Sequence, residues 1–206
     1  DAYKDTVEGY KYGGHVTSYF KTSTDPIQIN QSDSLQQRIN NGVSLMTFFG
    51  HAAATGFDIS TDNPANYQNY QKYPMVIANS CFAGNLFTDN SVSEDFILQP
   101  DKGAIGFIAN VHLGFEYFLS MYTKNLYSSF SDTLYGETIG HCMQYAILNT
   151  QVLNSSGEKR VCQEMILHGD PAIRMNAWSK AELTITQPDI YFTPSDVTTL
   201  IDSFKV

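Results

Sequence analysis

The stretch PMVIANSCFAG, residues 74–84, joins an apolar run, a turn and a cysteine. Met75 to Ala78 carry no polar alternation, which predicts a strand at 73–78 that is buried on both faces of a sheet. The run stops at Asn79, and Cys81 follows just before an Ala-Gly pair. The chain has only three cysteines. We therefore ask whether the one at this strand end has a chemical role.

Two further stretches are also continuous, mostly apolar runs. They predict strands at 43–49 (VSLMTFF) and 103–110 (GAIGFIAN), and both runs are too short for typical helices. Apolar residues then recur with helical spacing over 115–130 and over 133–148. Strands that are separated by helical segments predict an α/β fold with a mostly parallel sheet flanked by helices.

The other segments are shorter or more polar. Residues 14–20 (GHVTSYF) alternate and predict a strand, and the sequence predicts a short helix that Gly42 ends over 32–42. Residues 50–74 predict a long loop with one helical turn. The NSSGEK stretch at 154–159 predicts a turn.

The texture of the sequence changes near its C-terminal end. Alternating residues broken by prolines, as in ELTITQPDIYFTPSD, predict the beginning of a β-sandwich module at 179–206. We expect one α/β domain at 1–178, and we interpret the abrupt ends of the chain as those of a fragment that lacks the N-terminal part of its domain.

Composition narrows the classes of partner. The formal net charge is −9 and no basic run occurs, so nucleic acid and anionic membranes are poor partners for this chain. Charged residues make up 16% of the chain, against about a quarter in a typical domain. Sparse charge, together with many Asn, Ser, Thr and Tyr residues, favours an extracellular or cell-surface protein. No apolar run reaches the roughly 18 residues of a membrane span, so we expect no membrane insertion.

Two of the expected strands end next to a reactive side chain. His51 lies one glycine beyond the 43–49 strand, and Cys81 lies just beyond the 73–78 strand. The carboxyl ends of parallel strands share one edge of a sheet, so we expect both side chains at the same edge. An imidazole beside a thiol can accept its proton and leave a reactive thiolate. The competing interpretation is a small core cysteine and a loop histidine with no joint role.

Backbone groups near both residues could support such chemistry. A helix that starts after Ala83 and Gly84 would direct its N-terminal N–H groups at the sulfur. The same region, through Phe82, and the turn after His51, through Ala52, would supply the N–H donors of an oxyanion hole.

The remaining cysteines and histidines suggest no metal site. Cys142 and Cys162 lie too far apart in the sequence for a CxxC pair, and a disulfide between them stays open. No histidine has ligand partners at metal-binding spacing, and no EF-hand-like run of acids occurs. We expect that no cofactor is required.

Four motifs resemble those of the gingipain-like cysteine peptidases, peptidase family C25 of the caspase–gingipain clan. They are FFGHAAATGFD (48–58), VIANSCFAGNLF (76–87), KGAIGFIANVHLG (102–114) and EMILHGDPAIRM (164–175). The resemblance spans roughly residues 10–176 and implies a caspase-like sheet. The family usually has glycine directly after the histidine, where this chain has Ala52.

The resemblance also implies roles for particular residues. His51 would be the general base and Cys81 the nucleophile. The residues after the third strand would border the pocket for the substrate side chain that precedes the cleaved bond; they are Val111, His112, Leu113 and Glu116. Apart from the resemblance, Tyr117 of the following aromatic cluster is a further candidate for lining this pocket. A structural calcium ion is compatible with the family. The tail would be an immunoglobulin-like module, and export would follow the type IX route of Bacteroidetes-type bacteria.

Three functions remain open from the sequence. The first is a secreted cysteine endopeptidase that cleaves protein or peptide substrates through an acyl-enzyme at Cys81. The second is a transpeptidase of the secretion machinery, in which an amine replaces water. The third is a catalytically inactive surface module, which Ala52 favours. The sequence does not give the oligomeric state.

Overall fold

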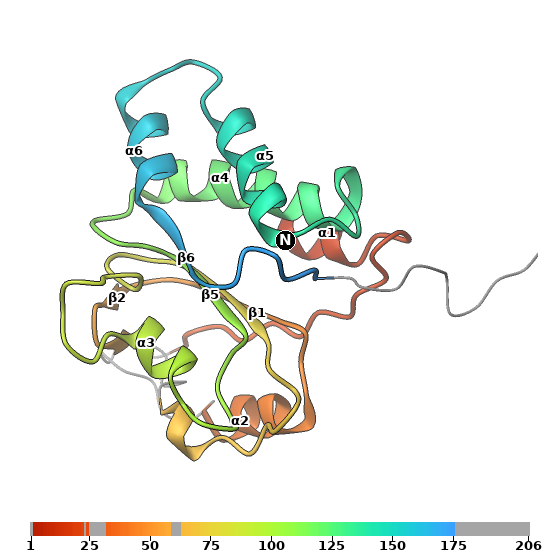
Figure 1. The fold of residues 1–206 in the computed structure, drawn as a ribbon, viewed down its shortest axis with the longest axis vertical. Helices are drawn as coiled ribbons and strands as arrows, with labels where there is room; N and C mark the ends of the chain where they lie inside the picture. The colour runs from red at the N-terminus through yellow and green to blue at the C-terminus, as the bar shows by residue number, and fades with distance from the viewer. Residues whose placement is uncertain (1, 23, 25–31, 59–62, 176–206) are drawn as a thin grey trace, which may run out of the picture. The chain divides into compact units, whose positions relative to one another are not determined.

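The structure is a computed structural model that describes residues 2–22, 24, 32–58 and 63–175. Its centre is a four-stranded sheet with the strand order β1-β4-β5-β6 (Figure 1). The first three of these strands are parallel, and β6 runs antiparallel to β5. Their bounds are β1 Leu45–Phe49, β4 Met75–Asn79, β5 Gly106–Asn110 and β6 Met165–Gly169. The predicted α/β fold with a mostly parallel sheet is confirmed.

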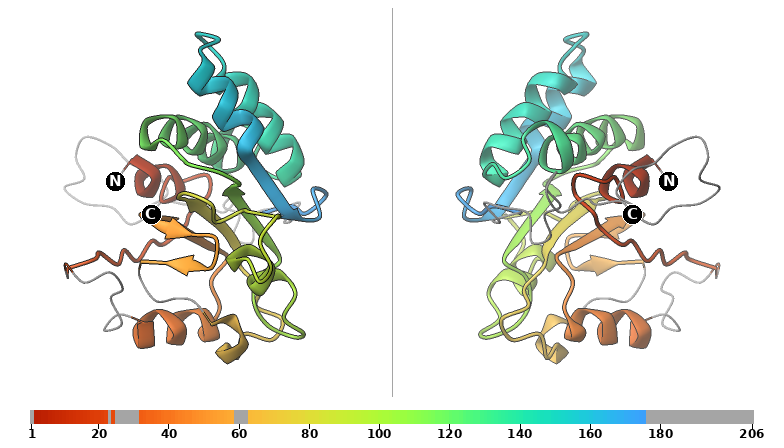
Figure 2. Two further views of the ribbon diagram at one scale, coloured as in Figure 1. Left: turned by 90° about the vertical axis from the view of Figure 1, so that its left-hand side faces the viewer. Right: turned by 90° about the vertical axis from the view of Figure 1, so that its right-hand side faces the viewer.

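Helices cover both faces of the sheet. Figures 1 and 2 show α1, α4, α5 and α6 on one face, with α2 and α3 on the other. Their bounds are α1 Ala2–Val7, α2 Ser32–Asn41, α3 Val92–Ile97, α4 Glu116–Ser128, α5 Ile139–Thr150 and α6 Ser156–Glu164. The short elements are the hairpin β2 Ala52–Ala53 and β3 Gly56–Phe57, the 3-10 turn Pro64–Asn66 and the π-helical turn Ser129–Thr133.

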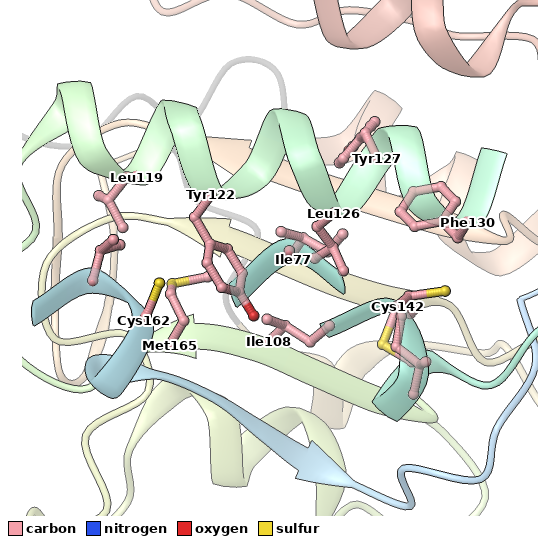
Figure 3. Close-up of a cluster of buried hydrophobic side chains, with 14 of the residues drawn as sticks. Ile77, Ile108, Leu119, Tyr122, Leu126, Tyr127, Phe130, Cys142, Cys162 and Met165 are labelled. Carbon is pink, nitrogen blue, oxygen red and sulfur yellow. The ribbon is translucent and has the colours of Figure 1, made fainter. Parts of the chain in front are cut away.

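The two faces of the sheet carry two separate hydrophobic cores. Ile77 of β4 packs with α4 in the first core, and the neighbouring residues Val76 and Ala78 belong to the second. Figure 3 shows Tyr122 and Leu126 of α4 directed at the sheet in the first core. All five residues of β4 and of β5 are buried, as their uninterrupted apolar sequences predict.

Two strand predictions need correction. Residues 14–20 form no strand, because no neighbouring strand pairs with them in the described part of the chain. The 43–49 run does form β1, but the strand is not buried on both faces. In the described residues β1 pairs only with β4, so it lies at an edge of the sheet, and Phe49 is 46% exposed.

The helix predictions are partly right. The helix predicted over 32–42 matches α2, and the one over 115–130 matches α4. The one over 133–148 starts late, because the π-helical turn precedes α5. The turn predicted at 154–159 is instead the start of α6, which a capping box between Ser155 and Glu158 begins. Turns, not a helix, follow Gly84.

Three further expectations concern the remainder of the chain. Cys142 and Cys162 are free, buried thiols, so no disulfide joins them, and burial raises the pKa of each. Among the described residues, no helix has the length and apolar character that a membrane crossing requires. The β-sandwich module predicted at 179–206, with the last residues of the predicted 1–178 domain, lies outside the described residues.

Candidate active site

The parallel pair β1 and β4 brings the two predicted reactive residues to one edge of the sheet. The strands are in register from Leu45 opposite Met75 to Phe49 opposite Asn79. His51 and Cys81 each lie two residues beyond the last pair. The backbone N–H of Gly50 donates to the Asn79 carbonyl at 3.4 Å, which continues the pairing toward the two turns. The expectation of neighbouring parallel strands with a common carboxyl edge is therefore confirmed.

The turn that carries Cys81 is held by the segment 110–114, which follows β5. The Cys81 thiol donates to the Gly114 carbonyl at 3.7 Å. The backbone N–H of Phe82 donates to the His112 carbonyl at 2.9 Å, and that of Gly84 donates to the Asn110 carbonyl at 3.0 Å. These three contacts, at Cys81 and at the two positions 82 and 84 that follow it, hold the half-buried thiol against the 110–114 segment.

Two features of this turn follow from its close packing. Phe82 adopts a φ of 57°, in the left-handed region that bulky residues rarely occupy. A Cβ atom on Gly84 would lie 2.8 Å from the Ala109 carbonyl oxygen, so only glycine fits there without a shift. Strain next to a proposed nucleophile is consistent with a functional turn.

The turn that carries His51 is held less firmly. His51 is exposed, and its imidazole has no hydrogen-bond partner among the residues that the structure describes. The Asp58 N–H donates to the His51 carbonyl at 3.1 Å, and the Asp58 carboxylate pairs with Lys21 at 3.2 Å. The two-residue strands β2 and β3 complete this turn.

The predicted oxyanion donors have different outcomes. The Phe82 N–H is engaged with the His112 carbonyl, because a turn stands where the sequence predicted a helix, so it is not free to bind an oxyanion. The Ala52 N–H points away from β3, since Ala52 faces Phe57 in a non-hydrogen-bonded pair of the hairpin. The Cys81 N–H, which the sequence did not single out, has no partner in the described chain.

The residues predicted to border a substrate pocket follow β5 on the same edge. Glu116 begins α4, and it is exposed, as are Leu113 (48%) and Tyr117 (67%). Val111 is half-buried, and its N–H donates to the Glu164 carbonyl at 3.0 Å. Only Leu113 of this set lines the small depression between the segment 110–114 and α6.

His112, the fifth predicted pocket residue, contacts an arginine that the sequence did not reveal. The Arg160 guanidinium of α6 lies 2.9 Å from His112 Nδ1, and it also donates to Glu164 at 2.8 Å. The His112 ring lies 5.2 Å from that of Phe82. Arg160 is 48 residues from His112 in the sequence, so no local motif could have paired them.

His168 of β6 makes a second contact with the Cys81 turn that the sequence did not reveal. Its Nε2 lies 3.3 Å from the Gly84 carbonyl in the Cys81 turn. Burial lowers the pKa of this imidazole, and the Gly84 contact and Glu94 oppose that shift. No group of three or more His, Cys, Asp or Glu side chains suited to a metal ion occurs in the described ranges.

Comparison with known proteins places the chain in a family. The model of peptidase family C25 matches residues 1–176. The chain belongs to peptidase family C25. Comparison with curated proteins finds no match.

Two solved structures share the fold of this chain. The Arg-specific cysteine proteinase gingipain R (RGPB) is 16% identical with a TM-score of 0.63, over 68% of this chain and 35% of that one. The complex of Porphyromonas gingivalis RgpB pro- and mature domains is 16% identical with a TM-score of 0.64, over 69% of this chain and 36% of that one. The chain thus spans about a third of the length of these relatives, and the likeness supports the fold.

Proposed function

We propose that this chain is the catalytic part of a secreted cysteine endopeptidase, with Cys81 as nucleophile and His51 as general base. The observation that carries the proposal is the register of β1 and β4, which sets the two residues at equal distances beyond neighbouring strand ends. Family membership supports the same chemistry. The expected location is extracellular or on the cell surface.

The reaction would proceed through an acyl-enzyme. His51 accepts the thiol proton, and Cys81 Sγ attacks the carbonyl carbon of the peptide bond. The C–N bond then breaks, and the imidazolium gives its proton to the leaving amine. A water molecule, deprotonated by His51, hydrolyses the thioester and restores the thiol. No metal or other cofactor takes part in these steps, although a structural calcium ion remains compatible with the proposal.

Two backbone donors would stabilise the oxyanion of the tetrahedral intermediates. The Cys81 N–H replaces the Phe82 N–H in this role, because the latter already donates to the His112 carbonyl. The Ala52 N–H, which points away from the β2–β3 hairpin, is the second donor.

The substrate would be a protein or peptide, bound along the edge that the two turns share. Residues Val111, His112, Leu113, Glu116 and Tyr117 are proposed to border its side chains. Their combination of exposed apolar groups and one carboxylate suits a peptide more than a polyanion, in keeping with the net charge of −9.

The second candidate is an inactive binding module on the same fold. Two observations favour it: the N–H of Phe82 is occupied, and alanine stands where the family usually has glycine. Such a module would bind protein or glycan through the same edge without covalent chemistry.

A peptidyl ketone that reacts with thiols tests the proposal. The proposed enzyme becomes labelled at Cys81 and hydrolyses a peptide library, and His51→Ala abolishes both. The buried thiols Cys142 and Cys162 serve as internal controls in the same mass spectrum. Absence of labelling and cleavage would refute the peptidase and favour the binding module. Transfer of the acyl group to an added amine in place of water would instead identify a transpeptidase.

A further inference from the structure

Two buried asparagine side chains, one residue beyond the paired parts of β4 and β5, each have one polar atom without a hydrogen-bond partner. Asn79 is 2% exposed and Asn110 is 1% exposed. Within the described residues, Nδ2 of Asn79 and Oδ1 of Asn110 have no hydrogen-bond partner. Nearly all buried polar groups are paired, because an unpaired one loses its hydration without compensation. Two such groups at one place call for an explanation.

The two unpaired groups are complementary neighbours. The register of β4 and β5 ends with Ala78 opposite Ala109, so Asn79 and Asn110 follow as the next pair. Their side chains lie on the same face of strands that run about 4.8 Å apart. One group is a donor and the other an acceptor. The structure forms no direct hydrogen bond between the two atoms, and a bridge through one water molecule would satisfy both.

Each of the two amides makes one hydrogen bond through its other polar atom. Asn110 Nδ2 lies 2.8 Å from the His112 carbonyl, which can only accept, so the nitrogen faces His112 and the oxygen faces β4. On the other side, the hydroxyl of Thr123 on α4 donates to Asn79 Oδ1, so Nδ2 of Asn79 is the atom that has no described partner. Thr123 is fully buried, so no solvent competes for this contact.

With a bridge between Asn79 and Asn110 in place, these contacts would form a path from α4 to the proposed nucleophile. We call the set the amide relay; its members are Thr123, Asn79, Asn110 and His112. At its end, the His112 carbonyl accepts both the Asn110 side chain and the backbone N–H of Phe82, the residue after Cys81. The His112 carbonyl thus connects the Asn110 side chain to the Cys81 turn.

We propose that Asn79 and Asn110 are positioning residues for Cys81, which act by pairing their side chains and so fixing the 110–114 segment under the thiol. The inference rests on the proposed function, in which Cys81 is the nucleophile. It does not require that either asparagine touches the substrate. It adds to the dyad a buried connection from α4 to the nucleophile.

A double-mutant cycle tests the pairing. Leucine has the branching of asparagine without its polar atoms, so Asn79→Leu and Asn110→Leu each break the relay and leave no added charge. The readout is the rate of Cys81 alkylation by iodoacetamide in folded protein, followed over pH by mass spectrometry. Each single variant should react about tenfold more slowly, and the double variant no more slowly than the slower single one. Asn125→Leu, which removes a half-buried amide bonded to Thr150, is the matched control and should react as wild type.

Other outcomes overturn the inference. Additive effects in the double variant would mean that the asparagines act separately. Unchanged alkylation in variants that merely unfold at lower denaturant would mean that their role is structural only. Where peptide cleavage is measurable, the relay predicts a fall in kcat with KM little changed, since it places the nucleophile and not the substrate.

A second pair of variants keeps the test decisive if the leucine variants do not fold. Thr123→Val removes the hydroxyl at nearly constant shape, and Thr123→Ser keeps it. The valine variant should slow alkylation several-fold and the serine variant should restore it; equal rates in the two would contradict the relay. Because alkylation needs no peptide cleavage, a responsive relay in a protein that cleaves nothing would refute the proposed function alone.

Discussion

The Cys81 turn and the His51 turn lie side by side, but they differ in how many contacts hold their reactive side chains. The Cys81 turn follows a central strand, and the segment 110–114 holds it through the thiol of Cys81 and the backbone N–H groups of Phe82 and Gly84. The His51 turn follows the edge strand β1, and its imidazole is exposed. Its backbone is held by the β2–β3 hairpin and by the contact from Asp58, but no described group holds the imidazole itself.

The difference shows how the two halves of a dyad can be built. The proposed nucleophile, Cys81, occupies a position that the core determines, so its place is set before any substrate arrives. The proposed base, His51, is an exposed side chain, so few contacts oppose movement of its imidazole. We infer that substrate binding brings the imidazole to a fixed sulfur, and not the reverse.

The largest expected effect comes from filling the space at Gly84. Gly84→Ala places a Cβ 2.8 Å from the Ala109 carbonyl oxygen, so the Cys81 turn must shift. We expect a loss of about 1–3 kcal/mol in the free energy of unfolding, together with slower Cys81 alkylation. Ala53→Gly in the exposed hairpin beside His51 should cost less than about 1 kcal/mol. Urea denaturation measures both, and equal losses would remove the contrast between the turns.

A smaller effect is expected from the backbone strain at Phe82. Phe82→Ala and Phe82→Gly both lose the ring contact with His112. Only glycine adopts a φ of 57° without a steric cost. The glycine variant should therefore be more stable than the alanine variant by about 0.5–1 kcal/mol in denaturation experiments. An alanine variant as stable as the glycine variant would show that the left-handed conformation is not imposed by the fold.

The Cys81 turn should also respond to pH through His168. Burial holds the pKa of this imidazole below its ordinary value in the folded protein, so the unfolded chain binds the proton first as the pH falls. Stability is therefore lost as the pH drops below about 6.5, the ordinary histidine value, toward the lowered value of the folded state. His168→Gln, which can still donate to Gly84, should flatten this part of the stability profile. A parallel profile for the variant would contradict the assignment, and exposed His15→Gln is the control.

The smallest effect is expected at the His51 turn. Asp58→Asn removes the ion pair with Lys21 but keeps the backbone N–H that donates to the His51 carbonyl. The free energy of unfolding should fall by less than about 1 kcal/mol. A loss larger than that of Gly84→Ala would reverse the order of the two turns.

Apolar runs allowed the sheet to be predicted, but not the place of each strand in it. The runs at 43–49 and 73–78 look alike, yet one forms an edge strand and the other a central one. Residues 14–20 have a strand-like pattern and form no strand, because a strand requires a partner that the local sequence does not contain. Helix α6 was missed although its capping box, Ser155 to Glu158, is visible in the sequence.

The candidate site likewise has a part that the sequence predicts and a part that it does not. His51 and Cys81 could be predicted because their positions depend on strand ends, which the sequence marks. The contacts that fix the thiol could not, because Arg160 and His168 approach from distant segments. The left-handed conformation of Phe82 is likewise imposed by the 110–114 segment and not by the preference of phenylalanine.

The most direct test of the account is a crystal structure of the chain with a peptidyl ketone bonded to Cys81. We predict that the His51 imidazole lies within about 3–4 Å of the sulfur, near hydrogen-bond reach. We also predict that the contacts from the Cys81 turn to His112 and Asn110 keep their present partners. An imidazole that stays far from the sulfur, or a Cys81 turn that leaves the 110–114 segment to meet it, would contradict the account.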